Sequence, residues 1–215
     1  MIRKERFKSS TIFHVFNKSI ANFGIFKKSS NAQRFIEILD YYNCTDIKKR
    51  FSVAKKKNLY HYVNLLIPNE NPQIKYISFN IMPDHYHLLI KILINDVFSK
   101  YINDVENSFT RFFNLKYKRK GPLWQSSFKA VRIRTNEQLL HVSRYVHLNS
   151  TTAGLVEKPE DWPFSSYKDF VSDRRFLGKI IKEISISDPI NYKKFVENNQ
   201  EYQKKLKQIK KLIFE

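Results

Sequence analysis

The alternation of hydrophobic and polar positions predicts strands interleaved with amphipathic helices. Strands are expected at residues 11–16, at residues 74–82, from Asp84 onward, and at residues 128–133. The second and third of these are separated only by a kink at Pro83, so they are expected to lie side by side. This order favours an α+β fold, with helices packed on one face of the sheet.

Capping signals mark where two helices begin. Ser30 and Gln33 form a capping box, which predicts a helix from about Asn31. A longer helix is expected after a cap at Asn95 or Asp96. Its apolar residues recur at helical spacing, which favours packing of one side.

The remaining segments are less regular. Residues 47–73 are expected to form a short helix followed by a strand or loop, and "EDWPFSSYKDF" a compact aromatic loop. Residues 174–215 are expected to form a basic, helical C-terminal extension to a domain of residues 1–173. The apolar stripe of that extension consists of Phe195, Tyr202, Leu206, Ile209 and Ile213.

The charge of the chain is strongly unbalanced. Lysine and arginine number 39 against 20 acidic residues, a net charge of +19. A polyanionic partner is the simplest explanation, and both a nucleic acid and an anionic membrane surface qualify. The basic residues are spread along the chain, which favours nucleic acid over one membrane-facing helix. A basic surface without a partner is the third alternative.

Other features bear on compartment and cofactors. A lone Cys44, no apolar leader and no apolar run of about 20 residues predict a cytoplasmic protein outside the membrane. The chain lacks the glycine-rich loops that bind nucleotide phosphates, so no nucleotide cofactor is expected.

Two of the six histidines stand two residues apart in "PDHYHLLIK". In a strand, His85 and His87 point to the same face and Tyr86 to the other. Two imidazoles so placed can share one divalent metal ion. The alternative is a chance pair that is hydrogen-bonded in the core.

A helix carries the second group of candidate residues. Thr135 caps it, and a stripe of Leu139, Val142 and Val146 is expected to lie on the sheet. Tyr145 and Asn149, four residues apart, border that stripe. If this helix packs against the histidine strand, two imidazoles, an amide oxygen and a phenol converge.

Such a set suits cleavage of a phosphodiester. A metal held by two neutral histidines and an amide keeps open positions for the phosphate. Tyr145 could attack phosphorus to give a covalent phosphotyrosine. A half-buried helix tyrosine with its hydroxyl in water is the alternative for Tyr145.

Further residues are candidates for DNA contact. Trp124 could stack a base, although core packing is equally compatible with the pattern. His14 and His61 are expected to be structural or surface groups, and His147 to point away from Tyr145. The full set of DNA-binding candidates is Lys118, Arg119, Lys120, Trp124, Lys129, Arg132, Arg134 and His141.

These motifs occur together in a known family. The strings "NIMPDHYHLLIK", "GPLWQSSFKA", "YVHLNSTTAGLV" and "DWPFSSY", in this order, resemble the single-tyrosine transposases of the HUH nuclease class. The likeness is greatest to the REP-associated tyrosine transposase branch and covers about residues 8–170. Asp84 stands where that family usually has Asn, and Ser150 where it usually has Pro.

The resemblance implies a fold, a reaction and roles for residues. The fold is a ferredoxin-like antiparallel sheet, and the reaction cleaves and rejoins single-stranded DNA beside a hairpin of palindromic repeats, with Mg²⁺ or Mn²⁺. His85, His87 and Asn149 match the metal ligands, and Tyr145 matches the nucleophile that becomes linked to a 5′-phosphate. The protein would be a monomer or a homodimer.

Two other functions fit the same residues. One is a domesticated protein that binds structured DNA or RNA without cutting it. The other is a rolling-circle replication enzyme or relaxase of the same chemistry, which differs in the DNA it binds.

Overall fold

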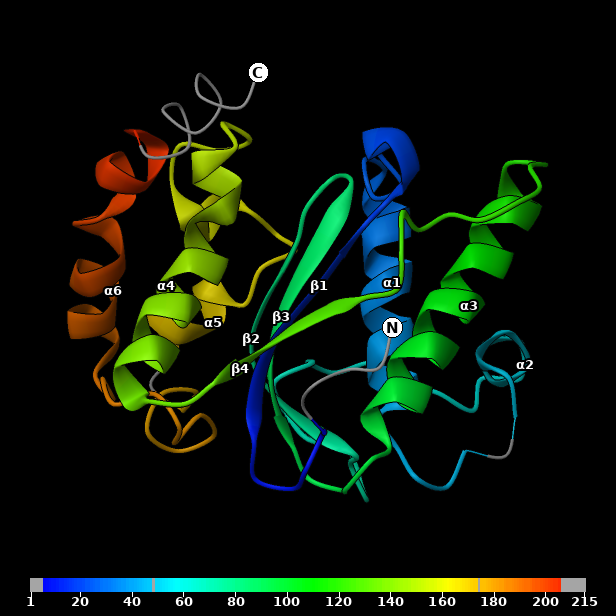
Figure 1. Ribbon diagram of the computed structural model, residues 1–215, viewed down its shortest axis with the longest axis horizontal. Coiled ribbons are helices and arrows are strands. Elements are labelled where there is room, and N and C mark those ends of the chain that lie inside the picture. Colours follow the sequence, from blue (N-terminus) through cyan, green and yellow to red (C-terminus); the bar gives the residue numbers. More distant parts are fainter. Residues whose placement is uncertain (1–5, 48, 174, 206–215) are drawn as a thin grey trace.

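The centre of the molecule is a four-stranded antiparallel sheet with strand order β2-β3-β1-β4 (Figure 1). The computed structural model describes residues 6–47, 49–173 and 175–205. The elements are β1 (Ile12–Lys18), η1 (Ile20–Asn22), α1 (Ser29–Tyr42), α2 (Phe51–Lys56), β2 (Ile74–Ile81), β3 (His85–Ile92), α3 (Phe98–Lys116), β4 (Lys129–Ile133), α4 (Asn136–Thr152), η2 (Pro159–Asp161), α5 (Tyr167–Ser172) and α6 (Pro189–Glu197). This strand order, with α1 and α3 as the connecting helices, confirms the predicted ferredoxin-like arrangement.

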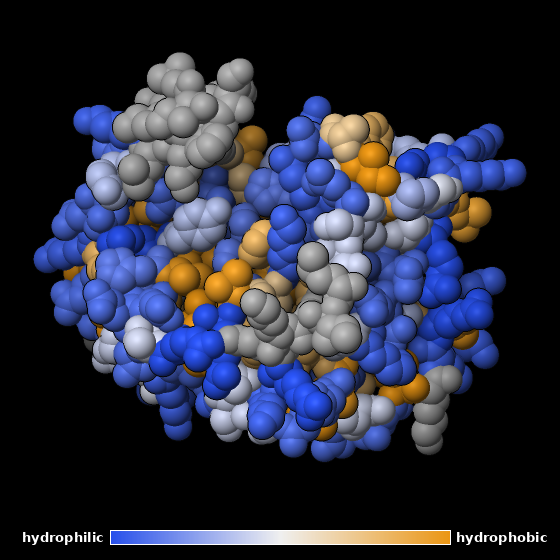
Figure 2. Space-filling view, viewed as in Figure 1, coloured by the Kyte–Doolittle hydropathy of each residue, from blue (hydrophilic) through white to orange (hydrophobic). Residues whose placement is uncertain are grey.

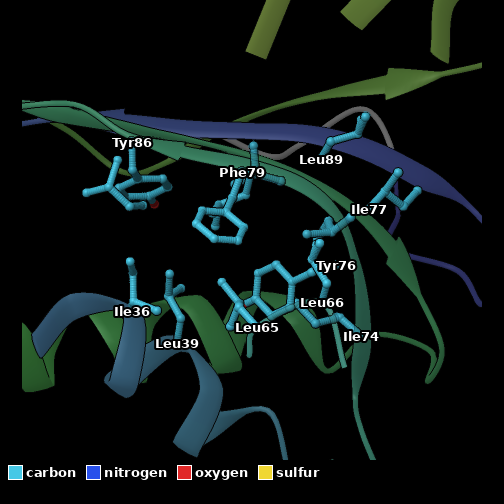
Figure 3. Close-up of a cluster of buried hydrophobic side chains, with 14 of the residues drawn as sticks. Ile36, Leu39, Leu65, Leu66, Ile74, Tyr76, Ile77, Phe79, Tyr86 and Leu89 are labelled. Atoms are coloured by element: carbon cyan, nitrogen blue, oxygen red, sulfur yellow. The ribbon is translucent and has the colours of Figure 1, made fainter. Parts of the chain in front are cut away.

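Helices α1 and α3 cover one face of the sheet and form the main core with it. Figure 3 shows Tyr76, Phe79 and Tyr86 pointing from the sheet toward Ile36 and Leu39 of α1, and all five side chains are buried. Burial of each such side chain contributes about 1.5–3 kcal/mol. The strand that carries the candidate histidines, β3, is therefore held on a firmly packed layer.

Helix α4 lies against the opposite face of the sheet, over β2 and β3. Asn80 of β2 donates a hydrogen bond from Nδ2 to the carbonyl oxygen of Val146 in α4, at 2.9 Å. Helices α4, α5 and α6 thus stand on the other side of the sheet from α1 and α3 (Figure 1). The expected packing of helices on one face holds for α1 and α3, whereas α4, whose apolar stripe was expected to lie on the sheet, covers the opposite face.

The reason for this second layer lies in β3. Leu88 and Leu89 point to opposite faces and both are fully buried, so the strand needs cover on both sides. β4, at the sheet edge, is different, because its Val131 is 54% exposed. In the same view as Figure 1, Figure 2 shows hydrophilic residues over most of the visible surface and a smaller hydrophobic group between α4 and the sheet.

One of the predicted capping boxes forms. The Thr135 hydroxyl accepts a hydrogen bond from the backbone N–H of Gln138 at 3.1 Å, so α4 begins at Asn136 as expected. The Gln138 side chain reaches back and accepts from the backbone N–H of Arg134 at 2.9 Å. These contacts fix the start of the helix that carries Tyr145.

The other predicted caps are wrong, because tertiary contacts use the same side chains. Neither α1 nor α3 has a side-chain cap. Ser30 accepts a hydrogen bond from Lys116, and Asn95 accepts one from the backbone N–H of Ser9. Asp96 is left-handed, with φ of 59°. A polar side chain near a helix start is therefore ambiguous in sequence.

The described part of the expected C-terminal extension packs on α4. Tyr192 of α6 is completely buried there, and Phe195 packs against the core. Tyr202 is exposed, whereas Leu206, Ile209 and Ile213 lie outside the described residues. The division of the chain at residue 173 stays a prediction.

The segment expected to be a compact aromatic loop contains η2 and α5, so it is more ordered than its composition indicates. Among the described residues, no helix combines the length and the apolar character that crossing a lipid bilayer requires.

Candidate active site between the sheet and helix α4

A hollow of about 490 Å³ opens where β1 ends and β3 begins, beside α4. We call it the site cleft. The strand register explains its composition, because Phe16 of β1 lies opposite His87 of β3 and Lys129 of β4, and Lys18 lies opposite His85. Residues directly opposite one another share a face of the sheet. The cleft is lined by Phe16, Asn17, Lys18, His85, His87, Gln125, Ser126, Lys129 and Tyr145.

His85 and His87 project into the site cleft together, as their spacing predicts. Their ring centroids are 5.0 Å apart and their planes are perpendicular, at 89°. His85 Nδ1 donates to Asp84 Oδ1 at 2.6 Å, and His87 Nδ1 lies 3.0 Å from His14 Nε2. In both rings Nδ1 is engaged, and Nε2 has no hydrogen-bond partner among the described residues.

This use of the nitrogens fits a metal site. Histidine ligands generally bind the ion through one nitrogen, while the other is held by a carboxylate or another acceptor. Burial lowers the pKa of His87 well below its usual range, as does the proximity of His14 and His85. The imidazole of His87 is therefore neutral at pH 7, which is the form that binds metal.

Tyr145 of α4 completes the group. Its ring meets that of His87 edge-on, with centroids 5.5 Å apart and planes at 80°. The side chain is 41% exposed, so its hydroxyl is within reach of a ligand in the cleft. Burial raises the pKa of Tyr145, and a hydrogen bond with the Asn149 side chain offsets part of that rise. The phenol is neutral at pH 7 and needs help to ionise.

Asn149 lies one turn after Tyr145 and is 9% exposed. Its Nδ2 donates to the carbonyl oxygen of Tyr145 at 2.7 Å, so Oδ1 is the end of the amide left for another contact. Two imidazole nitrogens and an amide oxygen form a donor set compatible with a divalent ion. Asn149 does not itself line the cleft, and its role as a ligand stays a prediction.

In the part of the chain that the structure describes, no carboxylate joins the histidine pair to form a metal-binding group. Within the described ranges, no group of three or more His, Cys, Asp or Glu side chains is placed to hold a metal ion. Asp84 is committed to His85 and forms an ion pair with Lys18 at 3.5 Å. Among the described residues, the amide of Asn149 is the candidate that the sequence offers for a third protein ligand.

The DNA-binding candidates are dispersed over the molecule. Lys129 lines the site cleft. Trp124 packs against Tyr86 at 5.7 Å and donates from Nε1 to Thr110, so of its two alternatives the structure favours core packing over base stacking. Lys118, Arg119 and Lys120 follow the end of α3.

Three further candidates lie near α4 or on β4. Arg132 lies opposite Phe13 of β1, on the face away from the cleft. Arg134 precedes the cap of α4. His141 contacts Arg144 at 2.8 Å and lies 6.1 Å from the ring of Phe195, on the side of α4 that faces α6.

Sequence reasoning missed His14. It was expected to be structural or surface, but its imidazole contacts both His87 and Tyr145. The only signal in the sequence is a lone histidine in an apolar strand, which does not reveal which strand lies beside it.

Known proteins resemble this chain in both sequence and fold. The family model described as "Transposase IS200 like" matches residues 32–149, which include the histidine pair, Tyr145 and Asn149. A Haemophilus influenzae protein assigned to the REP-associated tyrosine transposases is 32% identical over 134 residues, covering 57% of this chain and 70% of that relative. The REP-associated tyrosine transposase of Escherichia coli K12 is 28% identical over 88 residues, covering 40% of this chain and 50% of its own length.

A solved structure shares the fold. It is a REP-associated tyrosine transposase bound to a REP hairpin, with a TM-score of 0.54 and 19% identity. The match covers 80% of this chain and 85% of that one.

Proposed function

Since this chain belongs to the IS200-like transposases, and among them to the REP-associated tyrosine transposases, we propose that it is a metal-dependent endonuclease and transposase of single-stranded DNA. It cleaves the strand next to hairpins formed by palindromic repeats and rejoins it. The reaction passes through a covalent link between Tyr145 and a 5′-phosphate of the DNA.

The observation that carries this proposal is that a phenol and a histidine pair from different elements share one cleft. Tyr145 comes from α4, and His85 and His87 come from β3. The centroid distance of 5.5 Å between Tyr145 and His87 is short enough for both to contact one phosphate. The Tyr145 side chain is also 41% exposed and lines the same cleft, as a side chain that must reach a substrate requires.

The chemical step requires an attack on phosphorus. The Tyr145 hydroxyl loses its proton to solvent as its oxygen bonds to phosphorus, the bond from phosphorus to the 3′-oxygen breaks, and the released 3′-oxygen takes up a proton from solvent. A divalent ion, Mg²⁺ or Mn²⁺, held by Nε2 of His85 and His87 with Oδ1 of Asn149, would polarise the phosphate and stabilise its developing charge. The reverse attack by a 3′-hydroxyl rejoins the strand without a nucleotide cofactor.

Lysines of the cleft assist this step. Lys18 and Lys129 both line the hollow and can neutralise phosphate charge next to the reacting atoms. Asp84 pairs with Lys18 at 3.5 Å, which keeps the lysine at the cleft edge in the absence of DNA. Across the whole chain, the net charge of +19 supplies sequence-independent attraction for a nucleic acid.

Support for a hairpin substrate comes from the structural relative. That protein is bound to a REP hairpin, and it shares its fold with this chain. The basic residues of this chain are spread along its sequence, which is consistent with a folded DNA that extends beyond the cleft.

The experiment uses a hairpin oligonucleotide with a single-stranded flank, labelled at either its 5′ or its 3′ end. With Mn²⁺, the 3′-labelled strand should yield a protein–DNA band that survives denaturing electrophoresis. The 5′-labelled strand should instead yield a shorter free fragment ending in a 3′-hydroxyl. Tyr145→Phe should abolish both products, while His61→Phe, a change of an exposed histidine outside the cleft, should leave them unchanged. Tight binding without either product would instead support a non-catalytic DNA-binding protein.

A further inference from the structure

We propose that His14 is a positioning residue of the site cleft. It holds His87 in the tautomer that carries its hydrogen on Nδ1, which leaves the lone pair of Nε2 for a ligand in the cleft. The role of that nitrogen toward a metal rests on the proposed function. The hydrogen bond between the two imidazoles does not, and it can be tested in the metal-free protein.

The geometry joins the two rings directly. His14 Nε2 lies 3.0 Å from His87 Nδ1, and the rings stack with centroids 5.1 Å apart and planes at 24°. In the β1–β3 register, His14 lies opposite Leu89 and His87 opposite Phe16, so the contact is diagonal across one face. The Phe16 ring, 5.1 Å from that of His14, supports the arrangement from the same strand.

The chemistry of a neutral imidazole then fixes the protons. One ring nitrogen carries hydrogen and the other accepts. For His87 Nε2 to offer a lone pair to the cleft, its Nδ1 must carry the hydrogen and donate it to His14 Nε2. His14 must in turn carry its own hydrogen on Nδ1. A residue without an acceptor at position 14 would leave the tautomer of His87 unspecified.

The two histidines of the pair are held by different acceptors, and burial explains why. His85 is partly exposed and is held by the carboxylate of Asp84, which Lys18 neutralises. His87 is only 6% exposed. A carboxylate beside it would be a desolvated charge, which is costly unless it is paired. An imidazole accepts the same hydrogen bond without introducing charge.

His14 also contacts the nucleophile. Its ring meets that of Tyr145 edge-on, with centroids 5.9 Å apart and planes at 76°. The same side chain therefore contacts both His87 and Tyr145. Loss of its acceptor nitrogen is expected to affect metal binding, whereas loss of the whole ring is expected to loosen Tyr145 as well.

The first test reads the imidazole nitrogens of the unmodified, metal-free protein by ¹⁵N-detected NMR. The hydrogen of His87 is expected on Nδ1, and the lone pair on Nε2. In His14→Phe, which keeps an aromatic ring but lacks an acceptor, the two tautomers of His87 should become mixed. In His14→Gln, whose amide oxygen can accept near the position of Nε2, the Nδ1–H form should persist. A wild-type His87 protonated on Nε2 would overturn the proposal.

The second test measures Mn²⁺ affinity by calorimetry, with His61→Phe as the matched control. His14→Phe should bind Mn²⁺ about 10–100-fold more weakly, the loss typical of removing a residue that holds a metal ligand. His14→Gln should recover most of that affinity, and His61→Phe should bind as the wild type does. Equal affinity of His14→Phe and wild type would contradict the inference. A wild type that binds no Mn²⁺ would defeat the proposed function, while the NMR result would still decide the role of His14.

Discussion

Helix α4 presents Tyr145 on one side and His147 on the other. The two sides differ in how many of their polar atoms are hydrogen-bonded. On the cleft side, Tyr145 is 41% exposed beside His87. On the far side, His147 is buried, with Nδ1 2.9 Å from the Tyr192 hydroxyl and Nε2 2.8 Å from the Ser166 hydroxyl. Two positions in sequence therefore separate a candidate reactive group from a fully bonded one.

This difference separates side chains that hold elements of the fold together from side chains that can bind a ligand. Both nitrogens of His147 are occupied, so its network can only hold α6 and the segment before α5 against α4. His85 and His87 both line the cleft, and in each ring Nδ1 is occupied while Nε2 has no hydrogen-bond partner among the described residues. Residue type alone does not separate these roles; the number of atoms left unbonded does.

The largest contrast is expected between two tyrosine changes. Tyr145→Phe should reduce formation of the covalent DNA adduct by at least about 1,000-fold, because the nucleophilic oxygen is absent. Its melting temperature should change little, since the side chain is half-exposed. Tyr192→Phe should have the opposite profile, because it removes a buried hydroxyl bonded to His147 and Ser143, at a cost of about 1–3 kcal/mol. Adduct yield and chemical denaturation, measured on both variants, check this. Equal losses of adduct in the two variants would show that the comparison is mistaken.

Substitutions of the histidines should likewise fall into two groups, one that weakens metal binding and one that destabilises the fold. His85→Ala or His87→Ala should weaken Mn²⁺ binding by roughly 100-fold or more, because each removes an expected ligand. His147→Ala should destabilise the fold but leave Mn²⁺ affinity near that of the wild type. Calorimetric titration with Mn²⁺, at a temperature where all variants are folded, distinguishes the two groups. Strong Mn²⁺ binding by the double variant His85→Ala/His87→Ala would place the metal elsewhere.

Low pH should reduce the stability of the fold through the buried His147. Burial lowers the pKa of His147 to about 3, whereas the unfolded chain binds this proton near its ordinary pKa of about 6.5. Because the unfolded state takes up the proton first, the contribution of His147 to stability falls as the pH drops below about 6.5. The slope is at most about 1.4 kcal/mol per pH unit. The stability advantage of wild type over His147→Gln should therefore shrink between about pH 6.5 and 4, as measured by urea denaturation. A constant difference would argue against a neutral, buried His147.

The smallest effect is expected from the cleft lysine. Lys129→Ala should weaken hairpin binding a few-fold and reduce the slope of log affinity against log salt by about 1, because one phosphate contact is lost. Lys100→Ala is the matched control, since its ammonium is exposed at the start of α3 and paired with Asp104. Fluorescence anisotropy across a salt series measures both. Identical slopes for the two variants would remove Lys129 from the DNA contact.

Most of the fold was readable from the sequence because it depends on local periodicity. The strand period of 2 and the helix period of 3.6 located the four strands and the helices α1, α3 and α4. The caps at Ser30 and Asn95 were misjudged, because Lys116 and Ser9, distant in the chain, use those side chains. The stripe of Leu139, Val142 and Val146 placed α4 on the sheet, but periodicity does not say which face of the sheet a helix covers, so the division into two helical layers was not predicted.

The candidate site could be predicted only in part, because local spacing fixes the neighbours within one element but not the contacts between elements. His85 and His87 share a strand and Tyr145 and Asn149 share a helix, so each pair follows from spacing. His14 lies on a different strand, and its contact with His87 depends on the register between β1 and β3. Register is set by packing across the whole sheet, and no short motif encodes it.

The attachment point of DNA tests the central claim most directly. After reaction with a hairpin oligonucleotide and Mn²⁺, nuclease and protease digestion should leave one peptide carrying a nucleotide through its 5′-phosphate. Mass spectrometry is expected to locate that phosphate on Tyr145. A link to any other residue, or cleaved DNA with no covalently modified peptide, would contradict the account.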